Sequence, residues 1–303
     1  MSTVRGGVDL EAFLIREKER VEASLVEALS FLLAKVPGAY APAIRHGVLS
    51  GGKRLRPILC VAAYRAAGGE DDGVYALAAS LELIHAYSLM HDDLPCMDDA
   101  ELRRGEPTTH TVHGEGPTMV AGALLIPLAA LQAWKAAHAM GLDDEVGRGL
   151  VSELSRAAGG GGMVGGQVLD LLGEGRTLSV PELDDLHRRK TGALLRASLR
   201  MGGIAAGASD RALEAFDEYG RAIGLAFQIA DDLLDATSDV QALGKNPSDA
   251  ELGKSTYVTL FGVEEASRRA HELAEEAVTG LREGDVVVPE LEALARYIVD
   301  RTR

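Results

Sequence analysis

Two aspartate clusters, each directly after a long apolar stretch of helical sequence, constrain this chain more than any other feature. The first, Asp92-Asp93-Leu94-Pro95-Cys96-Met97-Asp98, follows residues 77–90, and the second, Asp231-Asp232-Leu233-Leu234-Asp235, follows residues 219–230. Carboxylates gathered near a protein interior raise one another's pKa unless a positive charge neutralises them. Oxygen ligands without His or Cys favour Mg²⁺, which shares its shell with substrate phosphates. We therefore expect a magnesium and diphosphate site.

The composition, together with the turn residues that separate the helical segments, predicts an all-α fold. The 303 residues are 47% hydrophobic but only 4% aromatic, and Ala, Leu, Glu and Arg, which favour helices, dominate. We find no strand alternation and no low-complexity linker, and the length allows one large domain over residues 1–303. Helices are expected over residues 10–36, 40–48, 55–67, 73–93, 117–140, 144–172, 181–206, 209–236, 257–278 and 289–301.

Charge and hydropathy restrict partners and location. A formal charge of −15, from 31 basic and 46 acidic residues, argues against nucleic acid as a partner. Residues 1–19 show no secretory signal, so we expect a cytoplasmic protein. The longest apolar stretch, residues 119–131, has 13 residues and contains Pro127, whereas a membrane helix needs about 20. We expect a buried core helix there and no membrane span.

Two motif matches are rejected on context. Residues 160–165 match the G-x-G-x-x-G of dinucleotide-binding loops, but the preceding residues 151–158 are helical rather than a strand. Close helix packing or a kink is the better interpretation. Glu82 and His85 match half of a di-iron motif, which requires a second copy on another helix, and the sequence contains none.

Helical geometry indicates how each acid cluster can act as a unit. With about 100° of rotation per residue, Asp231 and Asp235 lie roughly 40° apart on one helix face. Asp92 and Asp98 would point about 120° apart in an uninterrupted helix. Because Pro95 disfavours a helical Leu94 and has no N–H, we expect the chain to leave the helix after Asp93 and to return Asp98 beside Asp92.

Cations accompany the acids along the chain. Residues 51–57, Gly-Gly-Lys-Arg-Leu-Arg-Pro, open a predicted helix, where N–H groups and the macrodipole favour anions. Arg103 and Arg104 follow the first acid cluster, and Lys190 falls within a predicted helix. Each could be an ordinary solvated charge, but their joint placement around the acids indicates an anion site.

These residues together resemble the trans-prenyl diphosphate synthases, and among them the bacterial farnesyl diphosphate synthases. The likeness extends over nearly the whole chain through ordered motifs at residues 51–57, 85–98, 102–105, 162–167, 190–192, 227–235 and 253–257. It implies the isoprenoid synthase fold, a single large helical bundle around a deep central cavity. It also implies a homodimer and three Mg²⁺ ions when substrate is bound.

The resemblance assigns roles to named residues. The implied metal ligands are Asp92, Asp93, Asp98, Asp231 and Asp235. The implied contacts of the allylic diphosphate are Arg103, Lys190, Lys254 and, as a weaker candidate, Lys245, with Thr191 and Gln228 lining the site. The implied contacts of isopentenyl diphosphate are Gly52, Lys53, Arg56, His85 and Arg104. Asp92, Asp98, Arg103, Lys190, Asp231 and Lys254 form the implied catalytic set.

The implied reaction is the head-to-tail (1′-4) condensation of isopentenyl diphosphate with dimethylallyl or geranyl diphosphate, which releases pyrophosphate. Tyr87, five residues before Asp92, and its neighbour Ser88 are the candidate chain-length residues. A bulky ring on the side where the tail grows should stop elongation, so we expect mainly farnesyl diphosphate. Ala123 and Ala100 stand where the family often has Asp, which bears on substrate preference.

Three other interpretations stay open. A geranylgeranyl diphosphate synthase would share every motif above. A class I terpene cyclase would replace the second acid cluster by an Asn/Ser/Glu pattern and would lack Lys53 and Arg56. A noncatalytic subunit that binds an active prenyltransferase could lose its acids freely, so the intact clusters argue against it.

Overall fold

The computed structural model describes residues 8–237, 255–286 and 288–300, and nearly all of its regular structure is helical. The α-helices are α1 (Leu10–Leu32), α2 (Ala41–Leu49), α3 (Leu55–Ala66), α4 (Val74–Asp92), α5 (Thr109–His113), α6 (Glu115–Ala139), α7 (Asp144–Ala158), α8 (Met163–Gly173), α9 (Val180–His187), α10 (Ala193–Ala205), α11 (Asp210–Thr237), α13 (Tyr257–Phe261), α14 (Val263–Glu283) and α15 (Pro289–Asp300). Short 3₁₀ turns, η1 (Leu33–Lys35) and η2 (Gly38–Tyr40), join α1 to α2, and a π-turn, η3 (Arg188–Gly192), joins α9 to α10. The predicted all-α class is confirmed.

Several predicted helices are shorter than expected, because glycines interrupt them. The expected helix over residues 144–172 is two helices, with a break at residues 159–162. A Cβ atom on Gly162 would lie 2.1 Å from the carbonyl oxygen of Ala157, so the chain folds back there more tightly than a side chain allows. The predicted kink in this stretch is confirmed. Gly262, with φ of 80°, divides the helix expected over residues 257–278.

A small hairpin contradicts the expectation that the chain has no strand. β1 (Leu102–Arg103) and β2 (Glu106–Pro107) pair in antiparallel register, Leu102 with Pro107. Arg104 and Gly105 form the turn with φ of 56° and 80°. Two-residue strands are too short for an alternating pattern to reveal them. The hairpin fixes Arg103 and Arg104 just after the first acid cluster.

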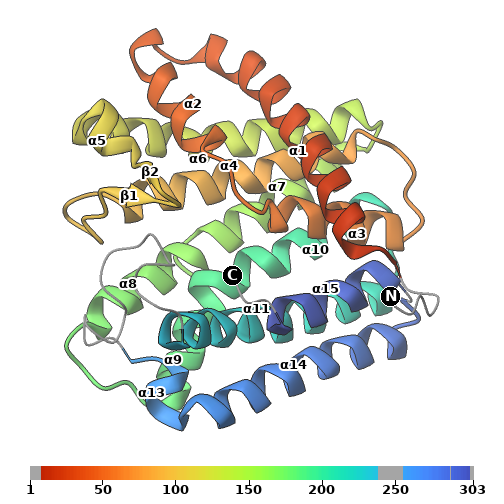
Figure 1. Cartoon of the computed structure of the whole chain (residues 1–303). Coiled ribbons are helices and arrows are strands. Elements are labelled where there is room, and N and C mark those ends of the chain that lie inside the picture. The colour runs from red at the N-terminus through yellow and green to blue at the C-terminus, as the bar shows by residue number, and fades with distance from the viewer. Residues whose placement is uncertain (1–7, 238–254, 287, 301–303) are drawn as a thin grey trace.

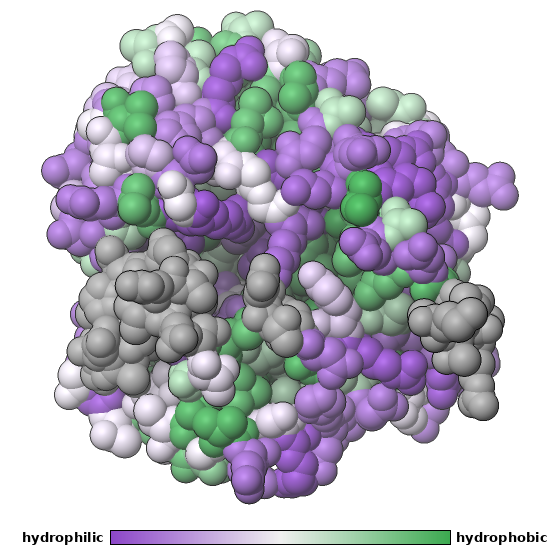
Figure 2. Space-filling model, in the orientation of Figure 1, coloured by the Kyte–Doolittle hydropathy of each residue, from purple (hydrophilic) through white to green (hydrophobic). Residues whose placement is uncertain are grey.

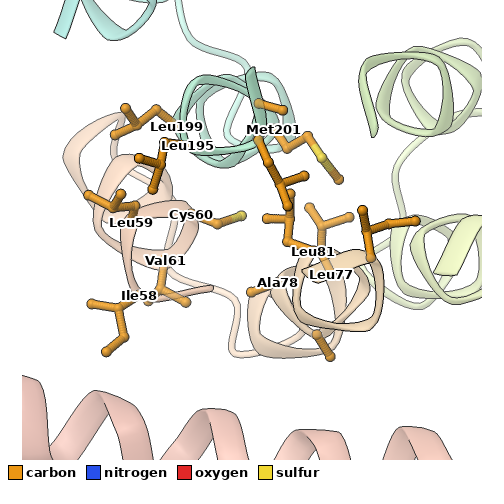
Figure 3. Close-up of a cluster of buried hydrophobic side chains, with 14 of the residues drawn as sticks. Ile58, Leu59, Cys60, Val61, Leu77, Ala78, Leu81, Leu195, Leu199 and Met201 are labelled. Carbon is orange, nitrogen blue, oxygen red and sulfur yellow. The ribbon is translucent and has the colours of Figure 1, made fainter. Parts of the chain in front are cut away.

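The core forms where α3, α4 and α10 meet. Figure 3 shows side chains of these helices pointing toward one another, among them Cys60 of α3, Leu81 of α4 and Leu199 of α10, each 0% exposed. Gly202 lets α10 approach α3 closely, because a Cβ there would lie 2.2 Å from the carbonyl oxygen of Cys60. This packing holds α4, and with it the first acid cluster, against the centre of the bundle.

The two acid-bearing helices lie on opposite sides of α10. In Figure 1, α4 runs beside α6 above α10, and α11 runs beside α14 below it, and α10 contacts both α4 and α11. Asp92 is the last residue of α4, and the second cluster lies in the last third of α11. Both clusters therefore come to the part of the bundle near α8 and η3.

Helix α6 is the described helix that is long and apolar enough to cross a membrane by length and composition. It packs instead against α4 and α7, and 44% of its most apolar window is buried in the fold. The expectation of a buried core helix holds for one face only. The other face leaves Met119 and Ile126 at 54% and 41% exposure.

The contact between α3 and α10 gives a stability prediction. Gly202→Ala should lower the free energy of unfolding by about 1–3 kcal/mol, because the added methyl group must push α10 away from α3. Gly149→Ala is the matched control, since Gly149 lies within α7 and its added methyl group would meet no neighbouring helix within 4 Å. It should raise stability by up to about 1 kcal/mol through helix propensity. Equal effects of the two substitutions in urea denaturation would contradict this account.

Candidate active site

The first acid cluster turns back on itself at the end of α4. Asp93 caps the helix, and the chain then folds so that the N–H of Asp98 donates to the carbonyl oxygen of Asp92 at 2.9 Å. The next turn is closed by a bond from the N–H of Met97 to the carbonyl oxygen of Leu94 at 2.8 Å. The predicted departure from the helix and the return of Asp98 to Asp92 are confirmed.

Asp93 and Arg103 form a partly buried ion pair behind this turn. Asp93 is 4% exposed, and its Oδ1 accepts from Nε and Nη2 of Arg103 at 2.8 and 2.6 Å. Its Oδ2 accepts from the same Nε at 3.0 Å. A bidentate ion pair of this kind fixes the orientation of both side chains. In this structure Asp93 therefore orients Arg103, which β1 brings to the cluster.

Asp92 lies in a place that disfavours its negative charge. Burial, first of all, raises the pKa of Asp92 from 3.8 to about 6, with Asp98 and Asp93 adding to the rise and Lys190 and Arg103 opposing it. The surrounding cations thus only partly compensate for burial and for the other acids. An added cation bound to Asp92 would favour the ionised form.

Lys190 stands among the carboxylates from the opposite side of the site. Its Nζ donates to Oδ2 of Asp170 at 2.5 Å. Burial lowers the pKa of Lys190, but Asp170, Asp92 and Asp98 raise it more, so the net shift is upward. Gly166 makes this position possible, because a Cβ there would lie 2.1 Å from the backbone nitrogen of Lys190. The π-turn η3 thereby presses directly against α8.

A cavity of about 180 Å³ lies between these elements. Its polar lining comes from both acid clusters, from α8, the end of α9, η3 and α11, and from the residues before α13: Asp98, Asp170, His187, Lys190, Thr191, Gln228, Asp232, Ser255 and Thr256. Figure 2 shows the surface hollowed near the centre of this face, with hydrophilic residues around the hollow. Thr191 Oγ1 donates to Oε1 of Gln228 at 2.8 Å and links η3 to α11. The structure therefore brings Asp98 and the second cluster to one cavity.

Within the second cluster the three aspartates differ. Asp232 is 5% exposed, and its Oδ2 accepts from the N–H of Tyr257 at 2.7 Å, so it anchors the start of α13. Asp231 and Asp235 are one helical turn apart on α11 and partly exposed, as the spacing predicted. The charge of Asp231 reaches Arg56, whose pKa is lowered by burial and raised in part by Asp231.

A second group of cations lies at the start of α3. Nη1 of Arg56 lies 3.3 Å from Nε2 of His85, and Arg104 donates from Nη1 to the carbonyl oxygen of Gly51 at 2.7 Å. Gly52 has a φ of 138°, which favours glycine, and a Cβ there would lie 2.5 Å from the same Arg104 nitrogen, so a side chain would displace Arg104. Burial, followed by the charges of Arg56 and Arg104, holds the pKa of His85 well below its usual value. His85 is therefore neutral at physiological pH beside the two arginines.

The remaining predicted residues have different outcomes. Lys53 is exposed at the same loop. Tyr87 is 9% exposed and packs edge-on against His91, with ring centroids 5.1 Å apart. Oγ of Ser88 donates to the carbonyl oxygen of His85 at 2.9 Å, within α4. Lys245 and Lys254 lie outside the described residues.

Sequence reasoning missed two acids that the structure places next to the predicted cations. Asp170 binds Lys190, and Glu82 binds Arg54 at 2.6 Å. Each is the only charged residue within a long apolar stretch of its helix, residues 163–173 and 74–84. A lone acid in buried helical sequence is seldom unpaired. That signal could have identified both.

The donor set fits Mg²⁺ held jointly with a diphosphate. Asp92 and Asp98 on one side and Asp231 and Asp235 on the other offer only carboxylate oxygens. Among the described residues, no three His, Cys, Asp or Glu side chains come together closely enough to hold a metal ion alone. Mg²⁺ commonly binds through one or two carboxylates, waters and substrate phosphates rather than in an all-protein cage.

A helical bundle that places Asp98, Asp232 and Lys190 at one cavity, with a second group of cations at the start of α3, is typical of metal-dependent enzymes that act on diphosphates. The polyprenyl synthetase family matches residues 38–291, and the chain belongs to that family.

Individual relatives are similar over almost their whole length. The farnesyl diphosphate synthase of Escherichia coli (strain K12) is 44% identical over 285 residues, which cover 91% of this chain and 95% of the relative. Geranylgeranyl pyrophosphate synthase 11, chloroplastic, of Arabidopsis thaliana is 39% identical, covering 97% and 82%. The crystal structure of a geranyltransferase from Helicobacter pylori, complexed with magnesium and isoprenyl diphosphate, has a TM-score of 0.80 and 32% identity, covering 99% and 98%.

The raised pKa of Asp92 gives a prediction for the metal-free protein. Because the folded protein keeps a proton on Asp92 up to about pH 6, whereas the unfolded chain loses it near pH 4, stability falls as pH rises through this window. Asp92→Asn removes that loss, so it should raise the free energy of unfolding at pH 7.5 by about 1–3 kcal/mol, with no gain below about pH 4.

Asp99→Asn is the control for this measurement, since Asp99 is exposed and has a left-handed φ of 48° that Asn also tolerates. Urea denaturation at the two pH values measures both variants. A destabilised Asp92→Asn at pH 7.5, or a gain that persists at pH 4, would show that the site does not strain this carboxylate.

Proposed function

We propose that this protein is a Mg²⁺-dependent prenyltransferase that condenses isopentenyl diphosphate head-to-tail with dimethylallyl or geranyl diphosphate, giving mainly farnesyl diphosphate and pyrophosphate. One observation carries the proposal: both carboxylate clusters and Lys190 meet at one cavity, a second cation group lies at the start of α3 within reach of the charge of Asp231, and each cation group suits a different diphosphate. Membership of the polyprenyl synthetase family and the similarity to farnesyl diphosphate synthase support it.

The allylic substrate reacts by losing its diphosphate. In our proposal Arg103 and Lys190 hold that diphosphate, with Lys254 and Lys245 as further candidates, while Asp92, Asp98, Asp231 and Asp235 hold Mg²⁺. Bound Mg²⁺ supplies positive charge to the diphosphate oxygens. As the C–O bond breaks, negative charge grows on these oxygens, and fixed cations stabilise it more than they stabilise the ground state. Asp93 contributes by orienting Arg103.

Isopentenyl diphosphate then completes the reaction. Lys53, Arg56 and Arg104 would bind its diphosphate, and neutral His85 would add an N–H donor beside Arg56. The double bond of isopentenyl diphosphate attacks the allylic carbocation and forms the new C–C bond. Loss of one proton to the departed pyrophosphate then restores a double bond, so no protein nucleophile is needed. Exclusion of water keeps the cation from being trapped.

The number of ions and the assembly are also proposals. Three Mg²⁺ ions would bind with substrate, two at the first cluster and one at the second. The exposed apolar residues Val112, Met119 and Ile126 on α5 and α6, at 53%, 54% and 41% exposure, support a homodimer that buries this face. Ala123 is exposed on the same helix. We further propose one domain and a cytoplasmic location.

Product length has two candidate answers. Buried Tyr87, one turn before His91 and five residues before Asp92, favours the C15 product, because its ring would limit the space for a growing tail. The similarity to geranylgeranyl pyrophosphate synthases keeps the C20 product as the second candidate. Both intact acid clusters argue against a noncatalytic subunit, and the second cluster together with Lys53 and Arg56 argues against a terpene cyclase.

One assay tests the reaction. Purified protein incubated with Mg²⁺, isopentenyl diphosphate and geranyl diphosphate should form farnesyl diphosphate and release one pyrophosphate for each bond made. Asp92→Ala and Asp231→Ala should each lower kcat by at least about 100-fold, with far-ultraviolet circular dichroism unchanged. Asp185→Ala, at an exposed ion pair with Arg189, should retain normal turnover. A wild-type protein that forms no C–C bond would reject the proposed function.

The chain-length role of Tyr87 has its own test. Tyr87→Ala should shift the product toward C20 and longer chains, because removing the ring opens room beyond the growing tail. Chromatography of dephosphorylated products measures the distribution. Phe261→Ala is a comparable aromatic truncation in α13 and should leave product length unchanged. An unaltered C15 product from Tyr87→Ala would assign Tyr87 to core packing only.

A further inference from the structure

We propose that Glu82 is a positioning residue for the isopentenyl diphosphate site: through Arg54 it anchors the loop that presents Lys53 and Arg56, and its charge holds the arginines of that site together. The inference rests on the proposed function, because it concerns the same diphosphate site. Glu82 itself would not touch the substrate.

Contacts between Glu82 and Arg54 are buried and short. Both side chains belong to residues that are 4% exposed, and Nη1 of Arg54 donates to Oε1 of Glu82 at 2.6 Å. Arg54 also donates from Nε to Glu22 at 2.7 Å and from Nη2 to the carbonyl oxygen of Val48 at 3.0 Å. Arg54 is thus held from three directions, and Glu82 supplies the most buried of its charged partners.

The backbone at Arg54 needs such an anchor. Arg54 caps α3 in a left-handed conformation with φ of 52°, which is uncommon for a residue with a long side chain. Gly51 and Gly52, just before it, have φ of 78° and 138°. An unusual local conformation of this kind persists only where surrounding contacts enforce it. The pairing with Glu82 therefore decides how the loop directs its neighbours, Lys53 and Arg56.

Charge balance gives Glu82 a second effect. Arg56 and Arg104 repel each other, and the field of Glu82 acts on both. Within the described part of the chain, Oε2 of Glu82 and Nε of Arg56 are buried without a hydrogen-bond partner. Glu82 therefore acts on Arg56 and Arg104 through its field and not through a hydrogen bond from Oε2. Without the charge of Glu82, Arg56 and Arg104 should move apart, and Arg54 should lose its buried partner.

Glu82 also opposes diphosphate binding, since a carboxylate repels an anion. We expect the positioning effect of Glu82 to outweigh its repulsion of the diphosphate for two reasons. Lys53, Arg54, Arg56 and Arg104 outnumber the acids Glu22 and Glu82, so the group remains positive. Removing one partner of a buried ion pair, moreover, leaves the other charge uncompensated, which is strongly unfavourable. The sign of the effect on isopentenyl diphosphate binding is therefore a direct test.

Glu82→Gln keeps the shape of the side chain and removes its charge. Titration calorimetry of isopentenyl diphosphate alone, together with steady-state kinetics, should show Kd and KM for isopentenyl diphosphate raised about 10-fold to 100-fold, the effect of losing a hydrogen bond to a charged group. KM for geranyl diphosphate should change by less than about threefold, because that substrate occupies the other cation group. Glu82→Asp keeps the charge and should bind isopentenyl diphosphate more tightly than Glu82→Gln.

Glu17→Gln is the matched control. Glu17 is equally buried at 4% exposure and accepts from Arg16 and from the hydroxyl group of Tyr75 at 3.0 and 2.5 Å, and Tyr75 lies about two helical turns before Glu82 on α4. Glu17→Gln should lower Tm without raising KM for either substrate. An unchanged or lower Kd for isopentenyl diphosphate in Glu82→Gln, or equal rises in KM for both substrates, would overturn the inference. Failure of the wild-type protein to turn over would instead reject the proposed function.

Discussion

Mutual compensation of buried charges is the constraint on which the rest of this structure depends. Asp98, just after α4, and Asp232, on α11, line a cavity that Lys190 also lines, while the arginines of the hairpin and of α3 act on the acid clusters through their charge. Burial disfavours the charges of Asp92, Lys190 and Arg56, and the pKa of Asp92, raised to about 6, shows that the protein's own cations do not fully offset it. Because the site has too little positive charge of its own to balance its carboxylates, it can bind divalent cations together with an anion.

Three acids, Asp93, Asp170 and Glu82, each hold one cation in place, and the cations form two groups. Asp93 holds Arg103 and Asp170 holds Lys190 on the side of the acid clusters, whereas Glu82 holds Arg54 beneath the start of α3. Each of these cations is thus oriented by an acid behind it. Fixed orientation matters for catalysis, because prearranged charges need no reorganisation when the bond breaks. Gly52 permits the close approach of the Arg104 side chain, and Gly166 permits the close approach of the Lys190 backbone.

Much of this arrangement could be predicted from the sequence. Composition and the turn residues between apolar stretches indicated the helices, and Pro95 predicted that Asp98 returns to Asp92, because proline forces the chain out of the helix at a known place. Helix ends were harder, since the break at Gly162 depends on a neighbouring carbonyl that leaves no room for a side chain, and the break at Gly262 on a left-handed φ of 80°. The β1–β2 hairpin has no periodic signal. Partners of buried acids such as Asp170 and Glu82 could not be assigned either, because pairing across helices depends on tertiary packing.

Joint binding of magnesium and diphosphate is the central claim, and titration calorimetry of Mg²⁺ tests it most directly. Metal-free protein should bind Mg²⁺ weakly when titrated alone, because the described acids form no complete metal shell. With inorganic pyrophosphate present, the affinity for Mg²⁺ should rise at least about 10-fold, and Mg²⁺ should raise the affinity for pyrophosphate by the same factor, as linkage requires. Equal Mg²⁺ affinity with and without pyrophosphate would contradict the account.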